Sequence, residues 1–557
     1  MDGGEVGMGL ESRYPELSFI TSVLDYEKRD VEWSRTEELS LNLPQAAQVL
    51  YVYGFSPHIS PLLQWLNEDT LRDIVFIEED LSVVARISEE GHGHLFSHER
   101  IHLRLRLDAE SLDQFSETLV RDFPFENIGF VNLKMDQEAY EKLKMVLLRK
   151  SVVESAVSLE LLHYQKLFGN LKANFPLFAQ ACDVGRWKGA FSGIPAVICG
   201  AGPSLRGAKE QIEKMQNRGI IMAGGSAITA LSSYHIVPDL LFAIDPNHEE
   251  FIRLGLHTAF DSPLIYGCRL QPDVVQAHIG ALAYAVTGTG GAIETWMEEQ
   301  LGIQDPRILE GLSGEALSVT AVALKCAIYF GCNPITFAGI DLSYSGGSRY
   351  TEGVVSDMQC ALEENFEKAS DTRFRVEGKV TMAKWLMERD VIQDTIKKNP
   401  QVTFIDGTGK GLMFDGASVK QDWEAHQYEL RDIKGLIHEW TESSKFSIAA
   451  ETIEEKLNLL KQSFKKCHEI ISEILEELEA LNVEGETREE TPREAVLEMD
   501  LEEEIAYQLA LKGAAYAWTF HIKKALQKES SKRPLFFIKS RLYRKLQLFI
   551  EEYVRSI

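Results

Sequence analysis

The sequence lacks long apolar runs and paired cysteines, and each absence excludes a class of protein. No segment has the roughly 18 successive uncharged apolar residues that a membrane-spanning helix needs, so we expect no transmembrane segment. The first residues, Met1 to Glu5, are acidic and lead into no apolar core of a secretory signal. The seven cysteines are odd in number and show no CxxC pair, which is typical of reduced core thiols in a cytoplasmic protein.

Basic residues are scarce as well. The 557 residues include 58 Lys and Arg against 85 Asp and Glu, which gives a formal net charge of −27. Because nucleic-acid binding needs a net basic face, we expect no nucleic-acid partner, although a local basic patch can still hold an anionic ligand. A hydrophobic content of 45% with 26% charged residues indicates a globular chain, and its length suggests about three or four domains.

The pattern of strands and helices predicts an α/β protein in four parts. Residues 1–135 contain a predicted strand, a turn at Gly54, a helix and a second strand that ends in an acidic residue. This is the order of a nucleotide-binding βαβ unit, but only one glycine stands where such a unit has two or three. We interpret these residues as a smaller, degenerate Rossmann-like domain, with a bound nucleotide as the alternative. Residues 136–189 have helical periodicity and form a helical linker. Residues 190–420 alternate short apolar strands with helices, which predicts a central Rossmann-like domain with a mostly parallel sheet.

Residues 421–557 are expected to form a helical C-terminal domain. Its end carries basic and apolar residues together, including Lys539 and Arg544, beside the acidic stretch 484–504. A basic amphipathic segment can lie on a membrane or bind an acidic partner. Packing against the acidic helices of the same chain is the interpretation that we favour.

One turn in the central domain is typical of a phosphate site. A buried strand at 196–199 runs into Gly200 and Gly202, which we expect to allow positive φ and close approach of a ligand. Pro203 fixes φ in the turn, and Ser204 is placed to cap the following helix, whose free N–H groups would then face an anion. A purely steric turn is the alternative.

Further turns follow other predicted strands of the same sheet. Gly225 and Ser226 come after the second strand, Asp245 after the third, and Thr289 and Gly290 after the strand at 283–286. Because the carboxyl ends of parallel strands share one edge, these turns should converge where such folds bind ligands.

A last group is rich in hydroxyl groups. Ser313 and Gly314 open a helix, and the strand after it leads into Asp341, Tyr344 and Tyr350. Tyrosine hydroxyls and a helix N-terminus suit a phosphate because they donate hydrogen bonds without needing a metal. The alternative is a polar loop with packed tyrosines.

The segments Gly200–Leu205, Ala243–Pro246, Ser313–Thr320 and Gly339–Leu342 resemble those of the motility-associated factor (Maf) proteins. Those are flagellin glycosyltransferases that share their central domain with the archaeal 6-hydroxymethylpterin pyrophosphokinases. The likeness covers about residues 45 to 420, with the glycine-proline-serine-leucine turn as its most specific part.

The same motifs are distantly similar to family 42 bacterial sialyltransferases, which use a cytidine-monophosphate (CMP)-activated nonulosonic acid. In that family two tyrosines contact the phosphate, and Tyr344 and Tyr350 stand near those places. The family's general-base histidine has no counterpart near Gly378, and its pocket asparagines appear here as Ala201 and as Gly225 or Ser226. This departure leaves the sugar donor and the base open.

The resemblance implies a glycosyltransferase that moves a nonulosonic acid from a CMP-activated donor to serine or threonine of a protein such as flagellin. Tyr344, Tyr350 and Ser313 would stabilise the leaving phosphate. Asp245 or Asp341 would take the acceptor's proton, or hold a divalent cation such as Mg²⁺. We assign no metal site. The alternatives are an ATP- and Mg²⁺-dependent pyrophosphokinase and a scaffold without catalysis.

One histidine cluster lies outside these motifs. Four imidazoles within eleven residues can bind zinc, but the neighbouring glycines at 91 and 93 favour a mobile exposed loop. The cluster consists of His92, His94, His98 and His102.

Overall fold

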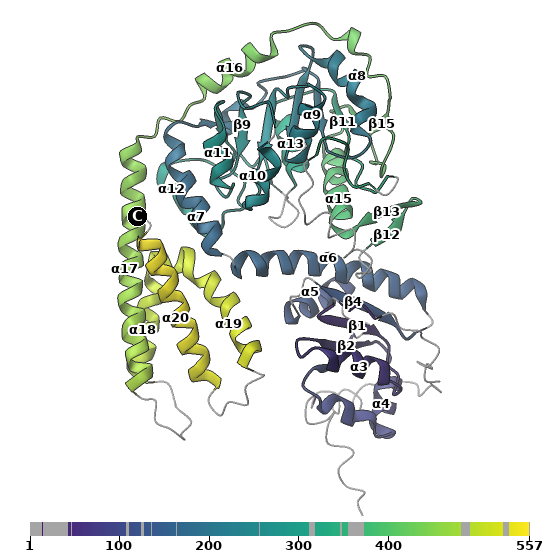
Figure 1. Cartoon of the computed structure of the whole chain (residues 1–557), viewed down its shortest axis with the longest axis vertical. Helices are drawn as coiled ribbons and strands as arrows, with labels where there is room; N and C mark the ends of the chain where they lie inside the picture. The colour runs from purple at the N-terminus through teal and green to yellow at the C-terminus, as the bar shows by residue number, and fades with distance from the viewer. Residues whose placement is uncertain are drawn as a thin grey trace, which may run out of the picture. The chain divides into compact units, whose positions relative to one another are not determined.

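The computed structural model forms two compact units (Figure 1), which are described separately. The first contains residues 1–156, 358–375 and 380–384, and the second contains the remainder. The structure describes residue 14 and residues 43–45, 47–106, 111–123, 127–134, 136–162, 164–255, 257–310, 318–345, 348–354, 373–480, 491–526 and 534–555.

The first unit contains a four-stranded parallel sheet in the order β3-β2-β1-β4. Strand β1 is apolar throughout, and β2 is apolar between its terminal residues Asp73 and Glu78. Both strands are buried along their whole length, as expected where both faces of a parallel sheet are covered. The degenerate Rossmann-like prediction is therefore confirmed as a fold. The elements are β1 (Val49–Tyr53), α3 (Ser60–Glu68), β2 (Asp73–Glu78), α4 (Leu81–Glu89), β3 (Ile101–Leu105), α5 (Leu112–Asp122) and β4 (Ile128–Asn132).

The turn after β1 is occupied by the protein's own side chains. Gly54 has a φ of 90°, and a Cβ there would lie 2.7 Å from Cγ of Lys134. Glu78, the acid that ends β2, is buried; it accepts hydrogen bonds from the amides of Glu79 and Asp80 and pairs with Lys134. Since a lysine covers the glycine turn and binds the acid, this geometry favours the scaffold interpretation over a nucleotide site.

The four clustered histidines each have a different partner. His102 contacts Asp73 at 3.0 Å, and His94 contacts the carbonyl of Gly91 at 2.9 Å. His92 faces Glu90, and His98 accepts from the amide of Arg100. In the part of the chain that the structure describes, no three His, Cys, Asp or Glu side chains gather to hold a metal ion.

The second unit is built on a nine-stranded parallel sheet in the order β15-β14-β11-β6-β7-β8-β9-β10-β5. The mostly parallel central sheet is thus confirmed. Its strands are β5 (Cys182–Asp183), β6 (Ala196–Cys199), β7 (Ile220–Gly224), β8 (Leu240–Ala243), β9 (Leu264–Tyr266), β10 (Leu282–Tyr284), β11 (Ile335–Ala338), β14 (Phe404–Asp406) and β15 (Ser418–Val419).

Helices flank this sheet in Figure 1. They are α7 (Tyr164–Asn174), α8 (Leu205–Met215), α9 (Ser226–Ser233), α10 (His248–Leu254), α11 (Pro272–Ala277), α12 (Gly291–Leu301), α13 (Val319–Tyr329) and α15 (Ala383–Lys398). A long helix, α6 (Gln137–Leu162), precedes them, and β12 (Arg373–Val376) pairs with β13 (Lys379–Met382).

The chain ends in a helical bundle, as predicted. Lys539 lies 2.9 Å from a carboxylate oxygen of Glu494 and 2.9 Å from one of Glu498, and Arg544 lies 2.7 Å from Glu479. The basic end therefore packs against acidic helices of its own chain. The bundle helices are α17 (Ala450–Ala480), α18 (Pro492–Glu503), α19 (Lys512–Leu526) and α20 (Pro534–Arg555), whereas α16 (Ile433–Ser443) precedes them and contacts β5.

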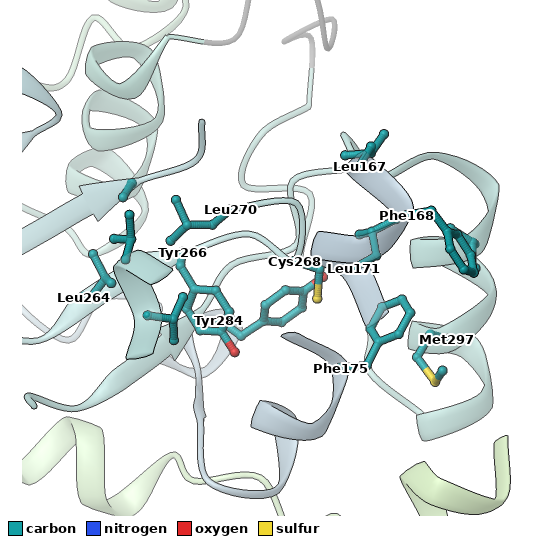
Figure 2. Packing of buried hydrophobic residues seen from close by; sticks show 14 of the residues in the cluster. Leu167, Phe168, Leu171, Phe175, Leu264, Tyr266, Cys268, Leu270, Tyr284 and Met297 are labelled. Carbon is teal, nitrogen blue, oxygen red and sulfur yellow. The ribbon is translucent and has the colours of Figure 1, made fainter. Parts of the chain in front are cut away.

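The bundle shares one hydrophobic core with the sheet. The ring of Phe168 on α7 contacts Phe464 of α17 and Tyr553 of α20, with centroids 5.4 and 4.6 Å away. Figure 2 shows Leu171 of α7, and Phe175 directly after this helix, pointing toward the core beside the end of the sheet. Among the described residues, no helix is long and apolar enough to cross a membrane.

Candidate functional site

The sheet of the second unit reverses its order between β6 and β11. From β6 the chain builds outward to β10, and β11 then returns to the opposite side of β6. In open parallel sheets the crevice beyond the strand ends at such a reversal is where ligands bind. The turn after β6 and the loop after β11 flank this position, and the amide of Gly202 donates to the carbonyl of Gly339 at 2.7 Å.

The two glycines of the turn serve a different purpose from the one expected. Neither Gly200 nor Gly202 has a positive φ, so that expectation is wrong. A Cβ on Gly200 would lie 2.5 Å from the carbonyl oxygen of Gly339, and one on Gly202 would lie 2.7 Å from Cγ of Asp341. Glycine is needed because the two loops pack against each other at backbone distance.

Ser204 also departs from its predicted role. It stands at the N-cap of α8 after Pro203, but its side chain caps no amide of the helix. Its amide donates to Oδ2 of Asp341 at 2.9 Å, and its hydroxyl donates to Oδ1. The Asp341 carboxylate thus takes the position at the start of α8 that an anionic ligand was expected to fill.

Asp341 therefore links the loop after β11 to the turn after β6 through its hydrogen bonds with Ser204. It is 3% exposed; burial raises the pKa of its carboxyl, and the hydrogen bonds from Ser204 act in the opposite direction. Its carbonyl accepts from the amide of Leu412, which brings in the loop after β14. Asp406 begins that loop, and its Oδ1 accepts from the amides of Thr408 and Gly409.

The tyrosine-bearing loop lies against the turn after β6. The amide of Thr351 donates to the carbonyl of Ala201 at 2.9 Å. Tyr344 packs on Trp385, with ring centroids 5.0 Å apart, and the Arg349 guanidinium lies 5.0 Å from the Tyr350 ring and 5.7 Å from that of Trp385. Both predicted tyrosines therefore belong to one cluster. Trp385 was not among the predicted residues, because it comes from α15.

The turn after β7 leaves open space. Gly225 has a φ of 51° and precedes Ser226, the first residue of α9, and no described side chain caps this helix. Only one described atom lies within 4 Å of where a Cβ on Gly225 would be, Oε1 of Glu250 at 4.0 Å. Apart from its chain neighbours, no described atom comes closer than 4.0 Å to this position beside a helix N-terminus.

An acidic pair bridged by arginine lies beside that turn. Oδ1 of Asp245 accepts from the amide and side chain of Asn247, and Oδ2 lies 3.7 Å from Arg253. Glu250 is 1% exposed; its Oε2 lies 3.6 Å from Arg253, and its Oε1 has no hydrogen-bond partner among the described residues. Burial, then the charge of Asp245, raises the pKa of Glu250 to about 7.

Glu250 was not identified from the sequence, because the sequence shows it only as one of two adjacent acidic residues at the start of a helix.

The predicted turn at Thr289 and Gly290 is closed by the protein itself. The amide of Gly290 donates to Oε2 of Glu294 at 2.8 Å, and the Thr289 carbonyl accepts from Arg269. Ser313 and Gly314 lie outside the described residues.

Comparison with known proteins agrees with this architecture. Residues 167–347 match the model of the family described as 6-hydroxymethylpterin diphosphokinase MptE-like. A solved Maf glycosyltransferase from Magnetospirillum magneticum AMB-1 is similar over 100% of this chain and 90% of its own, with 14% identity and a TM-score of 0.50. No curated protein matches the sequence. The chain therefore shares the fold of that Maf glycosyltransferase, and its residues 167–347 are similar to the MptE-like family.

The MptE-like segment begins on α7, which holds the site loops in place. The side-chain amide of Asn170 donates to the carbonyls of Pro246 and Arg269 at 2.8 and 3.0 Å. That of Asn174, one turn later, donates to the carbonyls of Cys268 and Leu270 at 2.8 and 2.7 Å. The helix thereby fixes the loops after β8 and β9 to each other.

The MptE-like domain also buries two carboxyls on α12. Glu294 accepts from the amides of Cys268 and Gly290, and Glu298 accepts from the hydroxyl of Tyr284. Burial, then the neighbouring Glu294, raises the pKa of Glu298 from 4.5 to about 8. The folded protein therefore holds a proton there that the unfolded chain releases, and stability should fall as the pH rises from about 4.5 to 8.

Glu298→Gln should remove the loss of stability at high pH, because glutamine keeps a hydrogen-bond acceptor for Tyr284 and does not ionise. We expect the variant to be more stable than the wild type at pH 8.5, by about 1 to 3 kcal/mol, and to have no such advantage at pH 5. Chemical denaturation at both pH values measures this, with the exposed neighbour Glu299→Gln as the control. An equal change at both pH values would contradict the assignment.

Proposed function

We propose that this protein is a glycosyltransferase that moves a nonulosonic acid from a CMP-activated donor to serine or threonine of a protein such as flagellin. The likeness to a Maf glycosyltransferase supports the choice of fold and reaction class. The observation that carries the proposal is the attachment of the loop with Tyr344 and Tyr350 to the turn after β6 through Thr351 and Ala201. This attachment supports a role for the hydroxyls of the loop in binding a phosphate at the reversal of the sheet.

In this reaction the bond between the sugar and the phosphate breaks, and the sugar forms a new bond to the acceptor oxygen. The leaving CMP gains charge, which the hydroxyls of Tyr344 and Tyr350 and the guanidinium of Arg349 would stabilise. The acceptor's proton must go to a base. Asp341 is buried, and both its oxygens accept hydrogen bonds from Ser204. Asp245 is less buried, and its Oδ2 lies 3.7 Å from Arg253, beyond hydrogen-bond distance, so Asp245 is the better candidate for the base.

The name of the matching family favours a second candidate, an ATP- and Mg²⁺-dependent pyrophosphokinase. That reaction would call on Asp245 and Asp341 to hold the metal. The carboxylate of Asp341 is tied to the start of α8, which does not fit a metal ligand, and we derive no step through Mg²⁺. A scaffold without catalysis remains the third candidate, since no histidine replaces the family's base near Gly378.

We further propose that the protein acts in the cytoplasm. Six cysteines lie in the described part of the chain, and all are buried thiols without a disulfide. Buried, unpaired thiols are usual in a reducing compartment.

A thermal-shift panel separates the three candidates. The protein is heated with CMP, with CMP-linked nonulosonic acids, and with ATP and Mg²⁺. We expect a rise in Tm of several degrees with the cytidine compounds, because a ligand at 100 times its Kd stabilises by about 2.7 kcal/mol. Stabilisation by ATP and Mg²⁺ alone would favour the pyrophosphokinase, and no stabilisation by any of them would favour the scaffold.

A further inference from the structure

We propose that Glu250 and the first amides of α9 bind a ribose hydroxyl of the donor nucleotide. The inference rests on the proposed function, because it requires a nucleotide in the crevice. It assigns a binding role to Glu250, which lies on α10 after β8 and is not part of the glycine-containing turns predicted from the sequence. Three observations carry it: an acceptor without a partner, a helix start without a cap, and a glycine without a side chain next to both.

The unused acceptor is Oε1 of Glu250. The side chain is 1% exposed, and this oxygen has no hydrogen-bond partner in the described part of the chain, whereas Oε2 faces Arg253. A buried polar atom without a partner is costly, so such atoms are rare in folded proteins. A ligand group that reaches Oε1 would satisfy it.

Gly225, at the start of α9, is the residue next to this oxygen. A methyl group on Gly225 would be in ordinary contact with Oε1, at 4.0 Å, and would meet no nearer described atom. The first amides of α9 follow directly, because Ser226 begins the helix, and no described side chain caps them. A small group entering beside Gly225 would therefore meet donors from the helix and, after a slight rotation of Glu250, an acceptor.

A hydroxyl fits this pair better than an anion does. A hydroxyl oxygen accepts from an amide of α9 while its proton is donated to Oε1. A phosphate would lie close to two carboxyls, Asp245 and Glu250, which share one arginine, and its charge would be repelled. The acidic surroundings thus favour a neutral group that can donate.

The position in the sheet favours ribose over the transferred sugar. The phosphate is expected at the reversal between β6 and β11, and β7 is the strand next to β6 on the other side. In nucleotide-binding α/β folds the ribose lies over the strand next to the phosphate turn and is held there by an acidic side chain. Here that strand ends at Gly224 and is followed by Gly225, and Glu250 supplies the acid from α10.

The experiment compares CMP with 2′-deoxy-CMP and 3′-deoxy-CMP by calorimetry on the full chain. At pH 8 we expect the wild type to bind CMP about 10 to 100 times more tightly than one of the deoxy compounds, because a hydrogen bond to a charged acceptor is lost. In Glu250→Gln the ratio should fall to about fivefold or less. The half-buried neighbour Glu249→Gln should keep the wild-type ratio.

The pH gives a second measurement that needs no variant. The charged groups facing Glu250 are Asp245 and Arg253; α9 presents no titratable group at its start, and Asp273 of α11 pairs with His248 instead. Because a carboxylate is a stronger acceptor than a carboxylic acid, the wild-type ratio should rise between pH 6 and pH 8. The ratio in Glu250→Gln should stay constant.

The outcomes separate this inference from the proposed function. If CMP binds and neither deoxy compound binds less tightly, the inference is overturned and the proposed function stands. If the ratio is unchanged in Glu250→Gln, the hydroxyl is held by another group and the inference is again overturned. If neither CMP nor its sugar conjugates bind, both proposals are overturned. Should Glu250→Gln unfold, the pH series on the wild type alone decides.

Discussion

Gly202→Ala is expected to abolish binding of the nucleotide donor and to lower the free energy of unfolding by about 1 to 3 kcal/mol. A Cβ at this position would lie 2.7 Å from the carbonyl oxygen of Gly339 and 2.7 Å from Cγ of Asp341. The first of these is backbone and cannot rotate away. The turn after β6 would have to leave the loop after β11, and the hydrogen bonds from Ser204 to Asp341 would break.

Gly207→Ala is the matched control, because the same atom is added five residues later. Gly207 lies within α8, and no described atom comes within 4 Å of the added Cβ. Alanine should stabilise the helix by about 0.5 to 1 kcal/mol and leave binding unchanged. Chemical denaturation and calorimetry with CMP measure both effects. Normal affinity in Gly202→Ala would show that the crevice is not formed by this turn.

The sheet could be predicted from the sequence because its information is local. Short apolar strands between amphipathic helices indicate a covered parallel sheet, and strand ends such as Gly225 mark the ligand-binding edge. The C-terminal packing was also readable, since basic residues such as Lys539 follow acidic helices in the same chain. These patterns need no knowledge of which loops touch.

The details of the site could not be predicted, because they depend on residues far apart in the sequence. Ser204 is a good helix cap by type, yet its hydroxyl is taken by Asp341, 137 residues later. Gly202 is needed because of the neighbouring loop rather than because of its own φ. The importance of Glu250 follows from burial at the contact of α10 with α9, which the pattern of charges around it does not reveal.

Tyr344→Phe and Tyr350→Phe should each lower the turnover of sugar transfer by about 100-fold while changing the affinity for CMP by less than about fivefold. Each change removes a hydroxyl and keeps the ring. The contact of residue 344 with Trp385 and that of residue 350 with Arg349 therefore persist, and the fold is preserved. The loss falls on turnover because the leaving phosphate gains charge as the bond to the sugar breaks.

Hydrolysis of a CMP-linked nonulosonic acid, with water as acceptor, gives this measurement without knowledge of the protein acceptor. Tyr516→Phe is the control, because Tyr516 lies on α19 with 79% of its surface exposed. If the two loop variants lost affinity and turnover in equal proportion, the hydroxyls would bind the ground state and the transition state alike. If both variants kept full turnover, the tyrosines would serve packing alone, and the leaving phosphate would lie elsewhere along the strand ends.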